Sequence, residues 1–175
     1  MIKHDKPSVE VWDHVVRLFH WSVAVLFLAS YWLTEGGSSI HEYCGYAVML
    51  LVIARIFWGF IGSPNALFKN FWPTAAAIKA QLKDFSSHPH GHGHSPLGAL
   101  MVLTLLALLL ITSLSGWMRN WDLFWGEDWI QRLHEISAHI LQFLVILHIT
   151  SVILIQKYAR INLIRGMITG KQKSR

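Results

Sequence analysis

The sequence predicts an all-α integral membrane protein that folds as a four-helix bundle over residues 1–175 as a single domain. Two properties of the composition point to a membrane. Only 14% of the residues are charged, against about 25% in a typical soluble domain, and 53% are hydrophobic. The mean hydropathy is correspondingly high, at +0.39. A third observation gives the number of helices, because the apolar residues are gathered into four long blocks instead of alternating with polar ones.

Each block holds roughly the 20 apolar residues that a helix needs to cross the hydrocarbon core. Polar or glycine-containing segments separate the blocks. The first block contains ionisable residues and lacks a small-residue cleavage site, so we expect it to be retained and not removed as a signal peptide. The predicted spans are Val15–Leu33, Tyr43–Ile61, Leu97–Met118 and Ile136–Gln156.

The lysines and arginines predict the orientation, because cytoplasmic segments retain them. Only Arg119 and Arg132 fall on the opposite side, so both termini are expected in the cytoplasm of a multi-pass protein of the bacterial inner membrane. The net charge of +5 is then a topology signal and requires no nucleic-acid partner. The other thirteen basic residues are Lys3, Lys6, Arg17, Arg55, Lys69, Lys79, Lys83, Lys157, Arg160, Arg165, Lys171, Lys173 and Arg175.

The connection between the second and third spans holds two further features. Residues 73–83 begin with a proline suited to a first helical turn and place Ile78 and Leu82 four apart, which predicts a short interfacial helix. The run His88-Pro89-His90-Gly91-His92-Gly93-His94 is typical of weak metal-binding tracts, but its glycines and proline impose no fixed geometry. We interpret it as a flexible loop.

Four histidines lie within or at the ends of the spans, where ionisable residues suggest function. His20 and His148 lie near the cytoplasmic ends of the first and fourth spans. His41 and His134 lie where the second and fourth spans begin on the opposite side. The four residues therefore fall into two pairs at two depths.

The spacing along the fourth span places two of these histidines on one face. His134 and His148 are 14 residues apart, about 40° short of four full turns and about 21 Å along the axis. This arrangement suits two b haems stacked through a bundle, with one helix contributing a ligand to each. We predict that His20 and His148 ligate the cytoplasmic haem and that His41 and His134 ligate the outer one. Ligation by two histidines fills both axial positions and favours electron transfer.

Two arginines and a glycine fit the same geometry. Arg55 follows His41 by 14 residues and Arg17 precedes His20 by three, so either guanidinium is placed to neutralise the propionates of the inner haem. Gly45, one turn after His41, would allow a flat macrocycle to approach its helix, and Gly98 and Gly116 are weaker candidates for the same role.

Several other features receive structural interpretations. His139 projects from a different face than His134 and His148, and His14 is expected at the membrane interface. Cys44 has no partner for a disulfide. The tryptophans Trp117, Trp121, Trp125 and Trp129 are interpreted as interfacial anchors. The alternative is a docking surface for a basic electron-transfer protein, since Asp122, Glu127, Asp128 and Glu135 make the segment acidic.

Taken together, these motifs resemble the bacterial cytochrome b561 group and the b-type cytochrome subunits of nickel-iron hydrogenases. The resemblance covers nearly the whole chain and implies a four-helix di-haem membrane cytochrome whose ligands are the same four histidines. The matching segments are Val11-Trp12-Asp13, Arg17-Leu18-Phe19-His20-Trp21, His41-x-x-x-Gly45-Tyr46, Arg55-Ile56-Phe57-Trp58-Gly59-Phe60-Ile61-Gly62, Gly93-His94-Ser95-Pro96-Leu97-Gly98, His134-Glu135, His148 and 162–170.

The expected function is electron transfer through two b haems between a periplasmic partner and the membrane quinone pool. The partner would be a c-type cytochrome, a hydrogenase or a dehydrogenase. The helices are expected to contact membrane lipid, and the sequence is also compatible with a homo-oligomer. The first alternative is a superoxide oxidase that passes electrons to quinone, although an acidic outer surface attracts an anion poorly. An alternative of another class is a metal-binding membrane protein that uses the His88–His94 run. A reduced b-haem absorption band separates the two haem hypotheses from this last one.

Overall fold

The computed structural model describes residues 8–83, 95–124, 126–159 and 162–173. Four long helices dominate it, and each is long and apolar enough to cross a membrane. This confirms the all-α class and the four spans. The helices are α1 (His14–Trp32), α2 (Ser39–Ile61), α5 (Pro96–Met118) and α6 (Asp128–Ala159).

Polar caps begin three of these helices. The Asp13 carboxylate accepts a hydrogen bond from the Val16 N–H (2.8 Å) at the start of α1. The Ser38 hydroxyl accepts from the His41 N–H (3.3 Å) at the start of α2. Ser95 caps α5 in the same way, and a proline occupies the first turn.

Two helices begin earlier than the sequence predicts. α2 begins at Ser39 instead of Tyr43, and α6 begins at Asp128 instead of Ile136. The apolar blocks mark only the portion of a helix suited to hydrocarbon, whereas hydrogen bonding continues the helix into its polar first turns. As a result, His41 and His134 lie inside helices and not at their boundaries.

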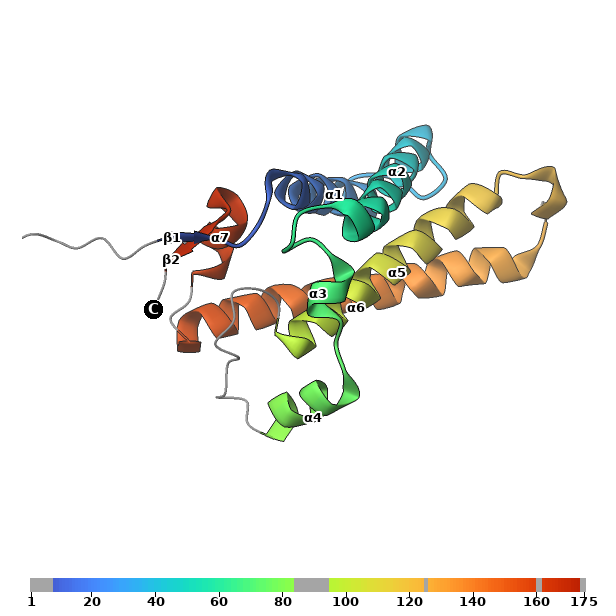
Figure 1. Ribbon diagram of the computed structural model, residues 1–175. Helices are drawn as coiled ribbons and strands as arrows, with labels where there is room; N and C mark the ends of the chain where they lie inside the picture. Colours follow the sequence, from blue (N-terminus) through green and yellow to red (C-terminus); the bar gives the residue numbers. More distant parts are fainter. Residues whose placement is uncertain (1–7, 84–94, 125, 160–161, 174–175) are drawn as a thin grey trace, which may run out of the picture.

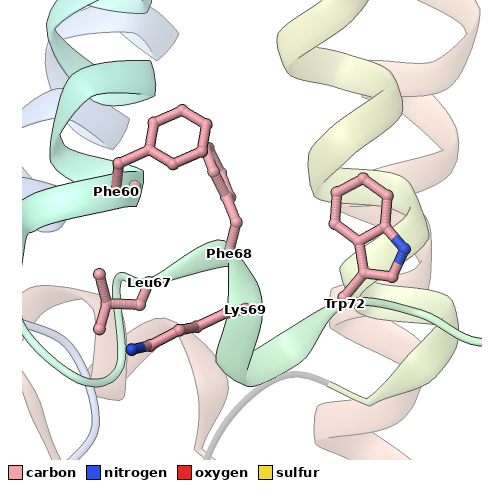
Figure 2. Close-up of a pocket in the computed structure, with 6 residues that line it drawn as sticks. Phe60, Leu67, Phe68, Lys69 and Trp72 are labelled. Atoms are coloured by element: carbon pink, nitrogen blue, oxygen red, sulfur yellow. The ribbon is translucent and has the colours of Figure 1, made fainter.

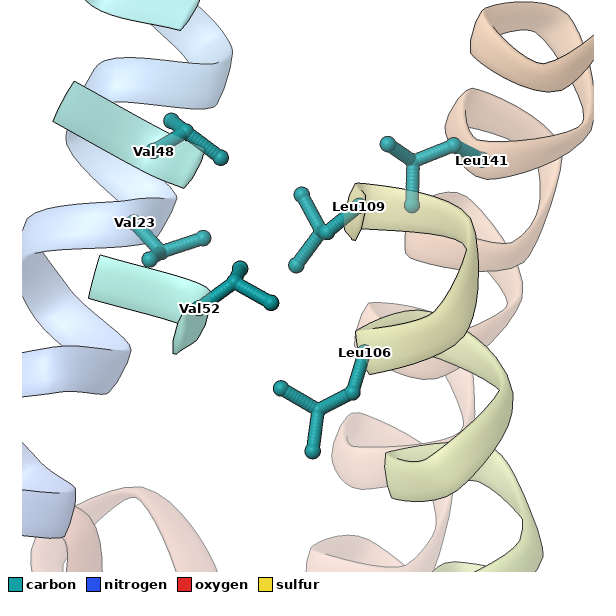
Figure 3. Packing of buried hydrophobic residues seen from close by; sticks show 6 residues of the cluster. All are labelled: Val23, Val48, Val52, Leu106, Leu109 and Leu141. Carbon is teal, nitrogen blue, oxygen red and sulfur yellow. The ribbon is translucent and has the colours of Figure 1, made fainter. Parts of the chain in front are cut away.

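The long helices form two layers (Figure 1). α1 packs against α2, α2 packs against α5, and α5 packs against α6. The side chains between the layers form a small apolar core, shown in Figure 3 and made of Val23, Val48, Val52, Leu106, Leu109 and Leu141. Many larger apolar side chains, among them Leu50, Phe57 and Ile153, are exposed on the outside of the bundle, as expected for a surface in contact with lipid.

Shorter elements join or flank the long helices. The predicted surface helix is α4 (Ala75–Lys83), which begins two residues after Pro73 because the Thr74 hydroxyl caps it by accepting from the Ala77 N–H (3.2 Å). The sequence analysis did not predict α3 (Phe68–Phe71), the 3₁₀ turn η1 (Asp122–Phe124), α7 (Leu163–Thr169), β1 (Ser8–Glu10) or β2 (Lys171–Lys173).

The two ends of the described chain meet in an antiparallel pair of strands. β1 pairs with β2, and Val11 and Trp12 donate backbone hydrogen bonds to the Gly170 carbonyl (2.8 and 3.2 Å). Gly170 has a φ of 78° and lies where a Cβ would meet the Trp12 carbonyl oxygen at 2.7 Å, so the position requires glycine. We call the end of the bundle with these strands the inner end, and the opposite end the outer end.

Candidate functional site

The structure brings the four histidines of the spans together in two facing pairs. At the inner end, the rings of His20 in α1 and His148 in α6 have centroids 6.5 Å apart. At the outer end, the rings of His41 in α2 and His134 in α6 have centroids 6.1 Å apart. α6 therefore contributes one ring to each pair, and each pair joins two histidines that the sequence places at the same depth.

Both separations suit a single metal ion between two imidazoles. Two metal–nitrogen bonds of about 2 Å, the usual length for histidine ligands, and roughly 1 Å from each ring nitrogen to its ring centre place the ring centres about 6 Å apart. The rings reach from α6 to α1 and α2, whereas the backbone of α6 packs mainly on α5. Each pair thus bridges the two layers of the bundle at a different depth.

The outer ring of His41 is held by groups from the end of α1. Its Nδ1 lies 3.3 Å from the Ser30 carbonyl oxygen, 3.1 Å from the Ser30 hydroxyl and 3.3 Å from the Thr34 hydroxyl. The Thr34 hydroxyl donates its own proton to the same Ser30 carbonyl (2.8 Å), so it presents a lone pair to the ring. Nδ1 is therefore the protonated nitrogen, and Nε2 is left for a metal.

His134 is held in the same way by α5. Its Nδ1 lies 2.9 Å from the Thr112 carbonyl oxygen and 3.4 Å from the Ser115 hydroxyl. That hydroxyl donates to the Thr112 carbonyl (3.0 Å), so it also faces the ring with a lone pair. Both outer histidines thus have the tautomer that frees Nε2.

The inner end carries unsatisfied donors instead. In the described part of the chain, three buried side-chain atoms lack a hydrogen-bond partner: Arg17 Nε, His20 Nδ1 and Arg55 Nη1. All three belong to the inner end of the bundle. Buried polar atoms in native proteins nearly always have partners, so three orphans in one region indicate a polar, anionic ligand.

The two arginines are anchored by their remaining nitrogens. Arg55 is only 4% exposed; its Nη2 donates to the Ala66 carbonyl (3.2 Å) and its guanidinium lies over the Phe68 ring, 5.1 Å from the centroid. Arg17 donates through Nη2 to the Ile168 carbonyl in α7. Each guanidinium is therefore fixed in place with a donor to spare.

Asp13 is an inner-end residue that sequence reasoning assigned no role. Besides capping α1, its carboxylate accepts hydrogen bonds from the Trp58 indole (3.2 Å) and the Ser63 hydroxyl, and so ties α1 to the end of α2. Partial burial alone would raise the pKa of Asp13. The hydrogen bonds from Ser63, Val16 and Trp58 outweigh burial and lower the pKa below its ordinary value of 3.8.

The glycines differ in the space around them. A Cβ on Gly45 would meet nothing within 4 Å, so the position predicted to admit a macrocycle is open. A Cβ on Gly116 would lie 3.0 Å from Cε1 and 3.1 Å from Nδ1 of the His134 ring, so this glycine makes room for the histidine itself. Gly98 only faces the hydroxyl of its own cap, Ser95 (3.1 Å).

Among the described residues, His14, His139 and Cys44 lie outside these clusters. His139 is exposed and bonds through Nδ1 to the Glu135 carbonyl (2.7 Å), and His14 is exposed. Cys44 is half-buried and free. Across the described ranges, no group of three or more His, Cys, Asp or Glu residues is placed to hold a metal ion. The His88–His94 run lies outside the described residues.

Aromatic rings, those of three exposed tryptophans and of the half-buried Phe124, extend from α5 across the outer connection. Trp117 contacts Trp121 (centroids 4.7 Å apart), Trp121 contacts Phe124 (6.0 Å), and Phe124 contacts Trp129 (5.9 Å). Trp125, which the sequence groups with them, lies outside the described residues. The rings form one connected aromatic surface at the outer end of the bundle, compatible with either predicted role.

An apolar pocket of about 270 Å³ lies at the inner end, beside the end of α2 (Figure 2). Phe60 and Phe68 meet edge to face at 5.6 Å on one side, and Trp72 lies across from them. Lys69 is the only charged residue among those that line it. Phe68 also lies under the Arg55 guanidinium, so one aromatic ring separates the pocket from that buried cation.

Sequence reasoning missed the groups that orient the outer rings. Ser30, Thr34, Thr112 and Ser115 are common helix and turn residues, and two of the contacts come from backbone carbonyls, which any residue supplies. One feature of the sequence could have identified them: serines and threonines that lie in apolar helices at the same depth as a histidine. In a membrane, polar side chains at the same depth tend to hydrogen-bond to one another.

Comparison with known protein families gives a match over most of the chain. A family model described as prokaryotic cytochrome b561 matches residues 11–170, nearly the whole chain. No significant match was found among curated proteins or among solved structures.

Proposed function

Because this chain belongs to the prokaryotic cytochrome b561 family, whose membership implies haem-based electron transfer across a membrane, we propose that it carries electrons between a periplasmic redox partner and the quinone pool. The observation that supports this most strongly is the presence of two facing histidine pairs at two depths that share α6. A haem iron supplies a one-electron couple when bound, and the protein supplies ligands, orientation and charge.

We assign His20 and His148 as axial ligands of an inner b haem, and His41 and His134 as axial ligands of an outer one. The support is the ring separation of each pair and, at the outer pair, the hydrogen bonds that leave Nε2 free. Gly45 contributes the open space beside the outer pair. Two histidines held for each haem would favour electron transfer over oxygen chemistry at the iron.

Arg17 and Arg55 are proposed to hold the propionates of the inner haem. The unsatisfied Nε of Arg17 and Nη1 of Arg55 are charged donors in a buried region, and a carboxylate satisfies both their hydrogen bonds and their charge.

We propose that the inner end faces the cytoplasm. Thirteen of the fifteen lysines and arginines belong to this end by the predicted topology. The pairing of β1 with β2 brings both ends of the described chain to one side, as an even number of spans requires. Attaching reporters to both termini tests this orientation, since both reporters are expected to be protected in right-side-out vesicles.

The outer surface favours a basic redox partner such as a c-type cytochrome, a hydrogenase or a dehydrogenase subunit. Against two basic residues, Arg119 and Arg132, this end carries six acidic ones, and the aromatic surface between them is exposed. The same negative charge disfavours superoxide as the electron donor. The acidic residues are Glu35, Glu42, Asp122, Glu127, Asp128 and Glu135.

The quinone is proposed to bind in the pocket beside Phe60, Phe68 and Trp72. Its lining is apolar apart from Lys69, which provides a donor for a quinone oxygen, and it lies next to Arg55 at the inner end. The variant Lys69→Gln is expected to raise the apparent KM for a short-chain quinone with haem content unchanged. Lys79→Gln on α4 is the matched control and is expected to leave the KM unchanged.

A rapid-mixing experiment tests the proposed route. The protein is reduced with dithionite, freed of excess reductant, and mixed anaerobically with a short-chain ubiquinone. Both haems of the native protein are expected to be reoxidised, whereas in His148→Ala the outer haem stays reduced because its route to the inner end is lost. Equally fast reoxidation of the outer haem in that variant would refute the route.

A further inference from the structure

The same arrangement of a carbonyl and a hydroxyl around the ring nitrogen Nδ1 occurs at both outer histidines. In each case, a backbone carbonyl oxygen faces Nδ1 of the ring, and a hydroxyl that donates to that carbonyl also faces Nδ1. At His41 the groups are the Ser30 carbonyl and the Thr34 hydroxyl, and the Ser30 hydroxyl is an additional neighbour of Nδ1 at 3.1 Å. At His134 they are the Thr112 carbonyl and the Ser115 hydroxyl. Because one set comes from the end of α1 and the other from α5, the arrangement is built twice from separate parts of the chain.

The inner histidines lack this support. Nδ1 of His20 is buried without a hydrogen-bond partner. Within the described residues, the ring contact recorded for His148 is with His20, and no hydrogen bond of its ring is found. The inner end instead carries the two guanidiniums of Arg17 and Arg55, each with an unsatisfied donor.

These differences act on the two haem potentials in opposite directions. An Nδ1–H that donates to a carbonyl makes the imidazole a stronger electron donor, which favours the ferric state and lowers the potential of the iron that it ligates. A nearby buried cation favours the state with one more electron and raises the potential. At the outer pair, both histidines donate from Nδ1 to a carbonyl, which lowers the potential of the outer haem. At the inner pair, the buried arginines raise the potential of the inner haem.

We propose that the hydroxyl–carbonyl sets at His41 and His134 make the outer haem the lower-potential member of the pair, so that electrons pass inward energetically downhill. This inference rests on the proposed function. With haem bound, such a transfer would oxidise the outer iron from ferrous to ferric and reduce the inner iron from ferric to ferrous by one electron, so it would balance without a proton or further reactant. Thr34 and Ser115 are positioning residues, because they act on the iron through the histidines.

A spectroelectrochemical titration of the purified protein tests the order of the potentials. Two one-electron steps are expected, and the step missing in His41→Ala identifies the outer haem. That step is expected at the lower potential. An outer potential equal to or above the inner one would overturn the inference, whether or not any hydroxyl variant folds.

The variants Thr34→Val and Ser115→Ala test the cause. Each removes one acceptor of an Nδ1–H while the carbonyl stays, so the outer potential is expected to rise partway toward the inner one, and to rise further in the double variant. The inner potential is expected to stay constant. Ser113→Ala and Thr104→Val are matched controls on α5, since both hydroxyls bond only to helix carbonyls, and they should move neither step.

The failure of this inference is distinguishable from failure of the proposed function. A native protein that binds fewer than two haems contradicts the proposed function. Two bound haems whose order is reversed, or whose outer step does not move in either hydroxyl variant, overturn only the inference drawn here.

Discussion

His41 and His134 face each other across the outer end of the bundle with ring centroids 6.1 Å apart. They belong to α2 and α6, whereas the backbone of α6 packs mainly against α5. The two rings therefore connect α2 in one layer with α6 in the other, two helices whose backbones do not pack closely on each other. Nδ1 of His41 faces the Ser30 carbonyl of α1 and Nδ1 of His134 faces the Thr112 carbonyl of α5, so these contacts leave both Nε2 atoms free.

The inner arginines are expected to control the inner haem. In Arg55→Gln, the inner haem should remain bound with a lower midpoint potential, because a buried positive charge that favours the state with one more electron is lost. Arg17→Gln should act in the same direction. The measurement is a redox titration. Arg132→Gln, on the exposed outer surface, serves as the control, and a shift there as large as in Arg55→Gln would count against the assignment.

Gly116 is expected to be required by the His134 ring. In Gly116→Ala, the added methyl group meets that ring at 3.0 Å, and overpacking of this kind costs about 1–3 kcal/mol. The affinity for the outer haem should fall by about one order of magnitude or more, while the inner haem is retained. Haem content after dilution measures the effect. Unchanged retention of both haems would show that the ring tolerates the methyl group.

Gly45 gives the complementary test. A Cβ there meets no protein atom within 4 Å, so Gly45→Leu should be harmless unless a macrocycle fills the space. We expect Gly45→Leu to weaken the outer haem, and Gly36→Leu, at an equally open loop position, to leave it unaffected. Full binding of the outer haem to Gly45→Leu would place the macrocycle away from this face of α2.

The four apolar blocks and the histidine spacing allowed most of this geometry to be predicted. A helix of fixed pitch converts 14 residues into nearly one face, so the shared role of α6 follows from His134 and His148 alone. The groups that hold the outer rings could not be predicted from the sequence, because the acceptors at Ser30 and Thr112 are backbone carbonyls, which every residue has. The pairing of β1 with β2 depends on the folded bundle to bring distant segments together, and no local pattern encodes it.

The contribution of Asp13 to stability is expected to depend on pH. Because its pKa is lowered in the folded protein, the carboxylate stabilises the fold fully above the ordinary value of 3.8, and this contribution is lost as the pH falls through the lower folded pKa. Asp13→Asn should lower the thermal unfolding temperature at pH 7, since asparagine keeps the cap but lacks the charge. The difference from the native protein should shrink below pH 3.8; a difference that stays constant would exclude the charge as its origin.

The acidic outer surface is expected to govern the rate of electron delivery by a basic c-type cytochrome. Raising the salt concentration should slow the bimolecular step, because screening weakens the attraction. Asp122→Asn and Glu127→Gln should slow it at low salt, measured by stopped-flow reduction of the haems. Glu10→Gln, which removes an exposed acid at the inner end, is the control. A rate independent of both salt and these variants would exclude electrostatic docking here.

The haem content of single-histidine variants tests the central claim most directly. The native protein is expected to bind two b haems per chain, measured from the reduced pyridine complex against protein concentration. His41→Ala and His134→Ala should each bind one haem with the same spectrum, His20→Ala and His148→Ala should each bind the other, and His139→Ala should bind both. The two-pair account would be contradicted if the four variants grouped differently by the haem that they lose, or if each of them still bound both haems.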